Sequence, residues 1–242
     1  MSSPSPSAPP SADLRALLAP VRDQGQRGTC LAFAVTAAHE VERGGSPPDD
    51  LSEEALYWGC KLTDGNWKSG TTFGSAARAL GRWGQPPEAD WPYEPRRNDA
   101  VAYSPPKRPG SGWFRSGLRQ VAVGVAGVRA YLDAGTPVLL GLTVFDTFFR
   151  PDAAGHIGDP APGAKARGRH AVLAVGHHPH ELLIRNSWGP TWALGGYAWI
   201  SDGYVGTHAG DVWVVDAAAG SGKTAPGRTH SGEPEGETYG TR

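Results

Sequence analysis

Two segments far apart in the chain decide the fold: residues 24–34, QGQRGTCLAFA, and residues 170–188, which begin HAVLAVG and end IRNSW. In the first, a glycine-rich turn leads into an apolar stretch that starts at Cys30, which predicts a helix with cysteine in its first turn. In the second, continuous apolar runs are typical of buried strands. A thiol at a helix start and an imidazole on a strand therefore point to a helical part and a sheet part that meet at one cleft.

The two halves of the chain differ in the periodicity of their apolar residues. The first half predicts helices with plausible capping residues, Ser52 at one start and Gly44 and Gly84 at two ends. The second half predicts one short helix followed by strands. The predicted helices are 30–43, 53–60, 75–83 and 125–134, and the predicted strands are 137–145, 170–177, 181–185, 196–201 and 211–215. Helices first and antiparallel strands afterwards indicate an α+β fold with a cleft between two lobes.

Composition limits the classes of function. The chain has 242 residues and is 39% hydrophobic, enough for one sizeable core. Its 23 basic and 24 acidic side chains give a net charge of -1, and no five-residue run of one sign occurs, so neither nucleic acid nor a membrane surface gains electrostatic support. The start of the chain lacks the basic and apolar regions of a signal peptide, and no stretch has the length of a membrane span.

The domain limits follow from the ends of the chain. Residues 1–12 are rich in Ser and Pro, and residues 218–242 are rich in Gly with Tyr239 as the only large apolar side chain, so we expect both ends to be disordered. The domain then covers residues 13–217, divided near residue 110 into a helical lobe, about 25–110, and a β lobe, about 111–217. Only two cysteines occur, too few for a disulfide scaffold, and we expect a cytoplasmic protein.

Four residues carry the candidate chemistry. The positive end of the helix that starts at Cys30 favours the thiolate. Gln24, on a glycine-flanked loop, could join the Cys30 N–H in holding an oxyanion. His170 opens a strand, and Asn186 ends the next one, where it could accept the second ring N–H of the imidazole. Each alone has an ordinary structural interpretation, whereas the combination indicates a thiol nucleophile for acyl transfer.

Here the sequence resembles the papain-type cysteine peptidases. The segments PVRDQGQRGTCLAFA (20–34), HAVLAVG (170–176) and ELLIRNSWGPTWALGGYAWI (181–200) resemble the nucleophile, histidine and asparagine segments of that family, and LSEE (51–54) and WPYE (91–94) resemble further landmarks. The resemblance covers roughly residues 18–216. The interval from Cys30 to His170 is 140 residues, inside the roughly 130–150 expected.

The resemblance implies a two-lobed papain-like fold, with a helical lobe and an antiparallel, barrel-like β lobe, and a cysteine endopeptidase of small bacterial type that acts on polypeptides without metal or cofactor. It implies Cys30 as nucleophile, His170 as general base and acid, Asn186 as the residue that orients the histidine, and Gln24 as oxyanion donor. Further implied site residues are Gly70 and Thr71 for backbone contacts with substrate, Gly141 and Ala171 in a roomy, largely apolar pocket, Trp188 as a shield of the His–Asn bond, and Trp192 on the leaving-group side.

Several positions depart from the family pattern. Arg27 stands where many relatives carry a disulfide-bonded cysteine, Leu31 replaces a tryptophan, and Thr71 replaces a glycine, which would narrow the cleft. Only a short segment precedes the domain where relatives have an inhibitory pro-segment, so we expect another restraint, such as a regulatory protein partner, an oligomeric state or a substrate-loaded target.

Two other functions remain open at this stage. A related thiol acyltransferase or deamidase would use the same residues, and a catalytically silent peptide-binding module would suit Leu31 and Thr71. A zinc site at His177, His178 and His180 is less favoured than a solvated turn, because metal ligands must converge. Cys60 is interpreted as a buried residue without a catalytic role.

Overall fold

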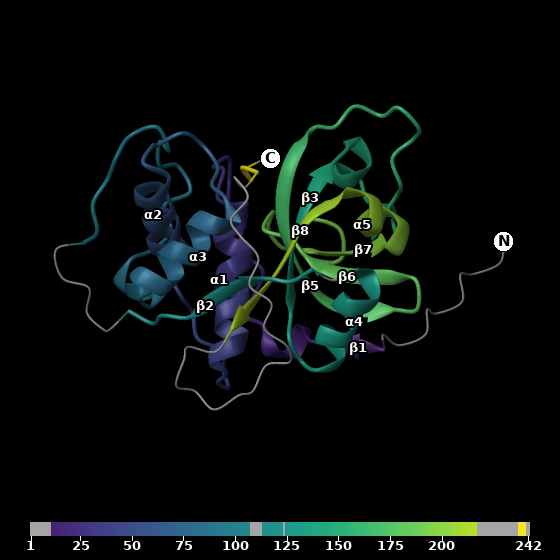
Figure 1. Cartoon of the computed structure of the whole chain (residues 1–242), viewed down its shortest axis with the longest axis horizontal. Coiled ribbons are helices and arrows are strands. Elements are labelled where there is room, and N and C mark those ends of the chain that lie inside the picture. The colour runs from purple at the N-terminus through teal and green to yellow at the C-terminus, as the bar shows by residue number, and fades with distance from the viewer. Residues whose placement is uncertain (1–10, 107–112, 123, 217–236, 241–242) are drawn as a thin grey trace.

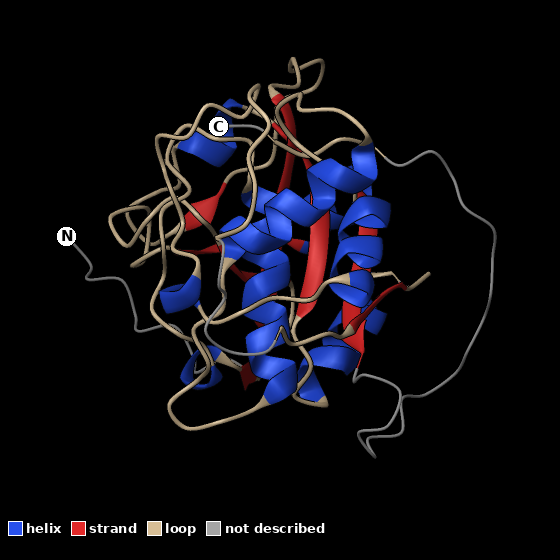
Figure 2. Cartoon of the chain, turned by 90° about the vertical axis from the view of Figure 1, so that its left-hand side faces the viewer, coloured by secondary structure: helices blue, strands red, loops and turns tan. Residues whose placement is uncertain are grey.

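In the computed structural model, helix α1 (Cys30–Arg43) lies between the helices α2 (Glu53–Asp64) and α3 (Phe73–Arg82) and the sheet (Figure 1). The structure describes residues 11–106, 113–122, 124–216 and 237–240. Every residue of α1 from Cys30 to Glu40 is buried, because the helix packs against helices on one side and against strand β5 (Gly168–His178) on the other. Its many alanines let both neighbours approach closely. Figure 2 shows the helices in front of the strands.

Of the other four α-helices in the described residues, three begin where a side chain caps them, and the one that starts at Val125 follows Gly124 without a side-chain cap. Ser52 accepts a hydrogen bond from the Ala55 N–H at 3.0 Å, as predicted. Thr72 accepts one from the Ser75 N–H at 3.1 Å, so the third helix begins two residues before the predicted start. The short last helix was not predicted, since seven residues show no clear period. These helices are α2 (Glu53–Asp64), α3 (Phe73–Arg82), α4 (Val125–Asp133) and α5 (Asp202–His208).

Within the described residues, eight strands form one sheet in the order β2-β8-β3-β5-β6-β7-β4, with β1 paired to β5. All pairs are antiparallel except β4 with β7. The predicted α+β fold with an antiparallel sheet is therefore confirmed, whereas the three shortest strands, β1, β2 and β4, were not predicted because they are too short to show alternation. The other strands are β1 (Ala12–Asp13), β2 (Gly117–Gln120), β3 (Val138–Val144), β4 (His156–Ile157), β6 (Glu181–Arg185), β7 (Tyr197–Ser201) and β8 (Ala209–Asp216).

Strand β3 lies in the interior of the sheet and, by pairing with β5, sets the position of the histidine. Its sequence VLLGLTV is almost entirely buried, and it pairs with β5 on one side and β8 on the other. The register places Gly141 opposite Ala171 and Leu142 opposite His170. This pairing fixes the position of His170 on β5, in the part of the strand that faces the start of α1.

The ends of the domain differ from the expectation of disorder wherever the structure describes them. Ser11 donates its N–H to the His177 carbonyl at 2.8 Å, and Ala12–Asp13 continues this pairing as β1. Tyr239 is fully buried and forms a β-bridge with Thr71. Residues 11–12 and 237–240 depart from this expectation, because β5 and Thr71 form hydrogen bonds with their backbone groups. Residues 1–10, 217–236 and 241–242 lie outside the described residues.

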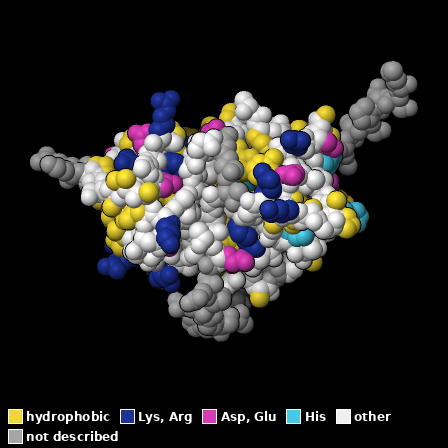
Figure 3. All heavy atoms as spheres, turned by 90° about the horizontal axis from the view of Figure 1, so that it is seen from above, with side chains coloured by type: hydrophobic (Ala, Val, Ile, Leu, Met, Phe, Trp, Pro, Cys, Tyr) yellow, Lys and Arg dark blue, Asp and Glu magenta, His cyan; other side chains and the backbone are white. Residues whose placement is uncertain are grey.

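Charged side chains of both signs lie on the face of the molecule that is seen from above. In Figure 3, Lys, Arg, Asp and Glu side chains are interspersed over the face seen from above. Within the described ranges, no helix combines the length and apolar character that crossing a membrane requires. The same residues contain no group of three or more His, Cys, Asp or Glu placed to hold a metal ion. His177 hydrogen-bonds Asp133 at 2.9 Å, and His178 stacks on Trp199.

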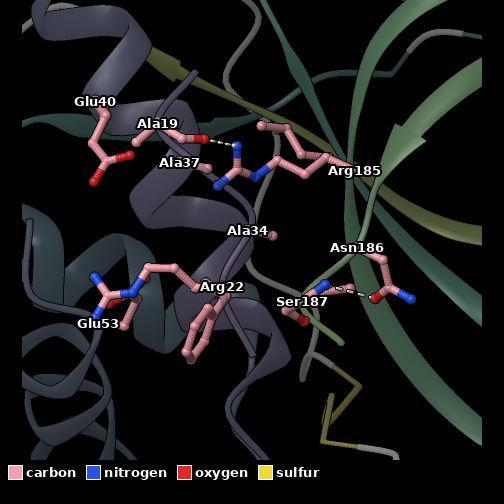
Figure 4. Close-up of a pocket in the computed structure, with 12 residues that line it drawn as sticks. Ala19, Arg22, Ala34, Ala37, Glu40, Glu53, Arg185, Asn186 and Ser187 are labelled. Atoms are coloured by element: carbon pink, nitrogen blue, oxygen red, sulfur yellow. Dashed lines mark hydrogen bonds and ion pairs between the residues drawn. The ribbon is translucent and has the colours of Figure 1, made fainter. Parts of the chain in front are cut away.

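A small polar cavity of about 20 Å³ lies between α1 and the sheet (Figure 4). Arg185, at the end of β6, reaches across it and donates to the carbonyls of Ala19 and Pro20 at 2.5 and 2.9 Å. Glu40 of α1 faces the cavity and accepts the Leu51 N–H at 2.9 Å. Burial raises the pKa of Glu40 from its ordinary 4.5 to about 7, against the opposing effect of that hydrogen bond.

This shift predicts how stability depends on pH. Between the ordinary pKa of 4.5 and the folded value of about 7, the folded chain keeps a proton on Glu40 that the unfolded chain has lost. The free energy of unfolding therefore falls as pH rises through this window, by up to ~3 kcal/mol. Glu40→Gln removes this titration, so the variant should gain stability relative to wild type between pH 4.5 and 7.5 in urea unfolding. Glu42→Gln, on the same helix but half-buried, is the control, and an equal effect of both changes at both pH values would contradict the assignment.

Candidate active site

The Cys30 thiol is held at the start of α1 by groups from both lobes. The Thr29 side chain does not cap the helix; its hydroxyl instead hydrogen-bonds that of Tyr93 at 2.8 Å. The Ala171 N–H of β5 points to Cys30 Sγ at 3.5 Å. Because Ala171 follows His170, the thiol lies next to the histidine segment that sequence separates from it by 140 residues. The helix N-terminus and this amide both favour a negative sulfur.

The orientation of the imidazole follows from its contact with Asn186. His170 Nε2 lies 2.7 Å from Asn186 Oδ1, and the Ser187 N–H donates to the same oxygen at 2.8 Å. A backbone N–H can only donate, so this atom is the amide oxygen, and His170 Nε2 must carry a hydrogen. Nδ1 is then the ring nitrogen that can exchange a proton with a thiol. The predicted role of Asn186 in orienting the ring has the geometry that it needs.

Gln24 connects the nucleophile loop to the asparagine segment. Its N–H donates to the Ser187 carbonyl at 2.8 Å, and the Ser187 hydroxyl donates to Gln24 Oε1 at 2.6 Å. Its side-chain amide then donates one hydrogen to the Arg27 carbonyl at 2.7 Å. Gln24 is fully buried. The loop residue predicted as an oxyanion donor is therefore also a fixed link between the two segments, which loop position alone did not reveal.

Aromatic side chains surround the imidazole. The Trp188 ring centroid is 4.7 Å from that of His170, and Phe148 meets the histidine edge-on at 5.6 Å. Trp192 stacks on Phe148 at 5.9 Å, and Phe149 stacks on Trp188 at 5.2 Å. Such a cluster excludes water from the His–Asn hydrogen bond. The sequence analysis did not identify Phe148 and Phe149. The only signal for them was that two adjacent aromatic residues follow soon after strand β3.

The groove beside the thiol contains an extended segment of the chain itself. Thr71 donates its N–H to the Tyr239 carbonyl at 3.0 Å and accepts the Tyr239 N–H at 2.7 Å. At Gly70, φ is +83°, and a Cβ there would lie 2.8 Å from the Tyr239 oxygen, so glycine is required. Thr71 thus makes, with a segment of its own chain, backbone contacts of the kind predicted for a substrate, and Gly70 allows the segment to approach closely. The Thr71 side chain does not prevent these contacts.

Tyr239 occupies the expected pocket, whose far end is polar. A Cβ on Gly141 would lie 2.3 Å from the Tyr239 hydroxyl, which places Gly141 on the pocket wall. Arg169 Nη2 donates to this hydroxyl at 2.7 Å, and the hydroxyl donates to Asp211 Oδ2. Burial, together with the Asp211 carboxylate, raises the pKa of Tyr239, so the phenol keeps its proton. The expectation of a largely apolar pocket was wrong, since strands β5 and β8 bring two charges to it.

Ala171 contributes differently from its predicted role. Its N–H contacts Cys30, and its residue lines the small cavity of Figure 4 together with Asn186 and Ser187. No sequence signal identified Asp211. Tyr239 did have a signal, as the single large apolar residue of a glycine-rich tail.

Arg27 forms a buried ionic network where relatives carry a disulfide. Its guanidinium contacts Glu54 of α2 at 2.5 Å, Asp99 at 2.7 Å and the Glu94 carbonyl at 2.8 Å, and the residue is only 4% exposed. Burial acts to lower the pKa of Arg27, but Glu54 outweighs it and the pKa is raised. Asp99 also accepts the Gly28 N–H at 3.2 Å. The network ties the nucleophile loop to α2 and to the loop around residue 99.

Removing Arg27 should therefore destabilise the domain. Arg27→Ala leaves the buried carboxylates of Glu54 and Asp99 without this cation, which we expect to cost about 3–5 kcal/mol in the free energy of unfolding. Arg43→Ala, which removes a partly exposed pair with Asp49, is the matched control and should cost less than about 1 kcal/mol. Denaturant unfolding of both variants measures the difference. A cost for Arg27→Ala as small as that for Arg43→Ala would show that the network is not stabilising.

With this geometry established, comparison with known proteins identifies the family. The family model described as "Papain family cysteine protease" matches residues 8–211. The chain belongs to the papain family of cysteine proteases.

Individual relatives are 28–29% identical to the chain over the aligned residues. Papain from Carica papaya is 29% identical over 187 residues, 76% of this chain and 52% of papain. Cysteine proteinase 3 of Entamoeba histolytica is 28% identical over 196 residues, 78% of this chain and 62% of that protein. Xylellain, a cysteine protease from Xylella fastidiosa, superposes with a TM-score of 0.73 at 28% identity, covering 88% of this chain and 87% of that one. The chain spans less than two thirds of the length of the first two relatives.

Proposed function

We propose that the chain is a cysteine endopeptidase that hydrolyses peptide bonds through a thioester intermediate. The observation that carries the proposal is the His170–Asn186 hydrogen bond, whose donor and acceptor are fixed by Ser187, beside a thiol at a helix N-terminus. Polypeptide substrates are what family membership implies. A cytoplasmic location is part of the proposal, supported by two cysteines that form no disulfide.

The proposed steps use groups already described. The Cys30 thiolate attacks the carbonyl carbon, while His170 Nδ1 holds the proton that the thiol gave up. The developing oxyanion is held by the Cys30 N–H and by the second N–H of the Gln24 amide. His170 then protonates the departing amine and activates the water that hydrolyses the thioester. Asn186 keeps the ring oriented, and Trp188 keeps water from that hydrogen bond.

The essential thiol is tested by variants of both cysteines. Cys30→Ala should lower hydrolysis of an unfolded protein by at least about 10⁴-fold, because the acyl acceptor is lost. Cys60→Ala should retain activity; Cys60 is fully buried in α2, and burial raises its thiol pKa. New amino termini in the products identify hydrolysis, whereas released ammonia or an amine-linked product would identify a deamidase or acyltransferase. If Cys30→Ala were as active as wild type, the chain would not be a cysteine peptidase.

The oxyanion donor is tested by kinetics. Gln24→Ala should lower kcat by roughly 10²–10³-fold with little change in KM, because the amide acts on charge that develops only in the transition state. Ser187→Ala is the control, because it removes the hydroxyl that contacts Gln24 Oε1 and keeps the donor amide. Comparable kcat losses in both variants would assign Gln24 a purely structural role.

A further inference from the structure

Residues 237–240 lie between the helical lobe and the sheet, beside the C label in Figure 1. The two hydrogen bonds between Tyr239 and Thr71 are reciprocal, and the two residues pair in antiparallel fashion. An extended peptide that adds to a strand edge forms such bonds. The segment therefore binds in the way that a peptide ligand would, although it belongs to the same chain.

The direction of the segment brings a carbonyl group toward the catalytic residues. The Gly240 N–H donates to the carbonyl of Arg169, the residue before His170, at 3.4 Å. A Cβ built on Gly240 would lie 3.3 Å from the Cα of Gly28, two residues before Cys30. The chain thus runs from the pocket of Tyr239 toward the thiol and the imidazole. The first acyl group beyond the pocket in this direction is that of Gly240.

The groove fits the side chains of this segment in particular. The Tyr239 ring packs edge-on against Phe73 at 5.1 Å, and its hydroxyl lies between Arg169 and Asp211. Arg169 also forms an ion pair with Glu237. A Cβ on Gly240 would lie 2.6 Å from the Gly70 Cα, and backbone at that distance cannot yield as a side chain would. The contacts therefore favour tyrosine followed by glycine, with an acidic residue two positions before the tyrosine.

We propose that residues 237–240 are an intramolecular substrate and that Cys30 cleaves the chain after Gly240. This inference rests on the proposed peptidase function. The Cys30 sulfur forms a bond with the Gly240 carbonyl carbon, the bond from that carbon to the Thr241 nitrogen breaks, and His170 supplies the proton that the released amine takes up. Water then hydrolyses the thioester. The net reaction consumes a water molecule and yields a Gly240 carboxylate and a product with Thr241 as its new amino terminus.

The covalent link has a second consequence. Because the segment is attached to the domain, its binding is intramolecular and has a high effective concentration. It competes with any peptide that binds in trans, before and after cleavage, since residues 237–240 remain on the domain in both cases. Tyr239→Ala should therefore hydrolyse a reporter peptide about tenfold faster than wild type at low peptide concentration.

Mass spectrometry of the intact full-length chain tests the cleavage. Wild type should lose Thr241 and Arg242 at a rate independent of protein concentration, whereas Cys30→Ala should keep both residues. A wild-type enzyme that hydrolyses a reporter peptide yet keeps residues 241–242 would overturn the self-cleavage proposal and leave the peptidase function intact. A chain inactive toward both would reject both. If the Cys30→Ala variant also lost residues 241–242, the cut would be assigned to another protease.

Recognition of the tyrosine is tested separately. Tyr239→Phe should slow self-cleavage by about tenfold, because the half-buried Arg169 and Asp211 side chains lose their shared partner. Tyr131→Phe on α4 removes a phenol hydroxyl away from the groove and should leave the rate unchanged. In trans, the peptide Glu-Thr-Tyr-Gly-Thr-Arg should have a kcat/KM at least about tenfold above its Phe-containing analogue and be cut after glycine. Equal values for the two peptides, or a cut elsewhere, would refute the assigned register.

Discussion

The packing of α1 against β5 is the constraint on which the rest of the molecule depends. It brings Cys30 Sγ to 3.5 Å from the Ala171 N–H and so joins two segments that belong to different lobes. Neither lobe holds a complete site, because the thiol and the helix dipole come from one and the imidazole and amide from the other. The bonds between Gln24 and Ser187 fix this junction from a second direction. The geometry of the candidate active site therefore depends on the packing between the lobes.

Buried charged side chains link segments of this chain that other bonds, such as a disulfide, could also link. Arg27, with Glu54 and Asp99, ties the nucleophile loop to its surroundings through ionic contacts that need no oxidising environment. Behind the site, Arg185 binds two carbonyls while Glu40 lies in the same small cavity with a raised pKa. Such groups are costly to bury and costly to leave unpaired, so they specify one arrangement of loop and lobe. These charged groups are buried next to the candidate active site, where the positions of the side chains matter most.

The contacts that residues 237–240 make beside the candidate site change how the family resemblance is interpreted for this chain. Gly70, Thr71 and Gly141 contact a segment that the sequence presents as part of a featureless tail. The pocket gains its polar end because Arg169 of β5 and Asp211 of β8 converge on one hydroxyl. Local sequence could not foresee this, since the two residues lie 42 positions apart on strands that are not neighbours. Only the insertion of β3 between those strands brings the two side chains to one end of the pocket.

The sequence by itself determined the helix that starts at Cys30 and the central strands, and it singled out Cys30, His170, Asn186 and Gln24 as candidate catalytic residues. These carry local signals, because apolar periodicity, caps and glycine turns act over a few residues. The tertiary structure alone decided the hydrogen on His170 Nε2, the Arg27 network, the aromatic cluster around the imidazole and the place of Tyr239. Each of these depends on contacts between residues distant in the chain, and such contacts form only when the lobes pack. Tyr239 shows the difference most clearly, since an isolated aromatic residue in a polar tail becomes a buried ligand once a matching pocket exists.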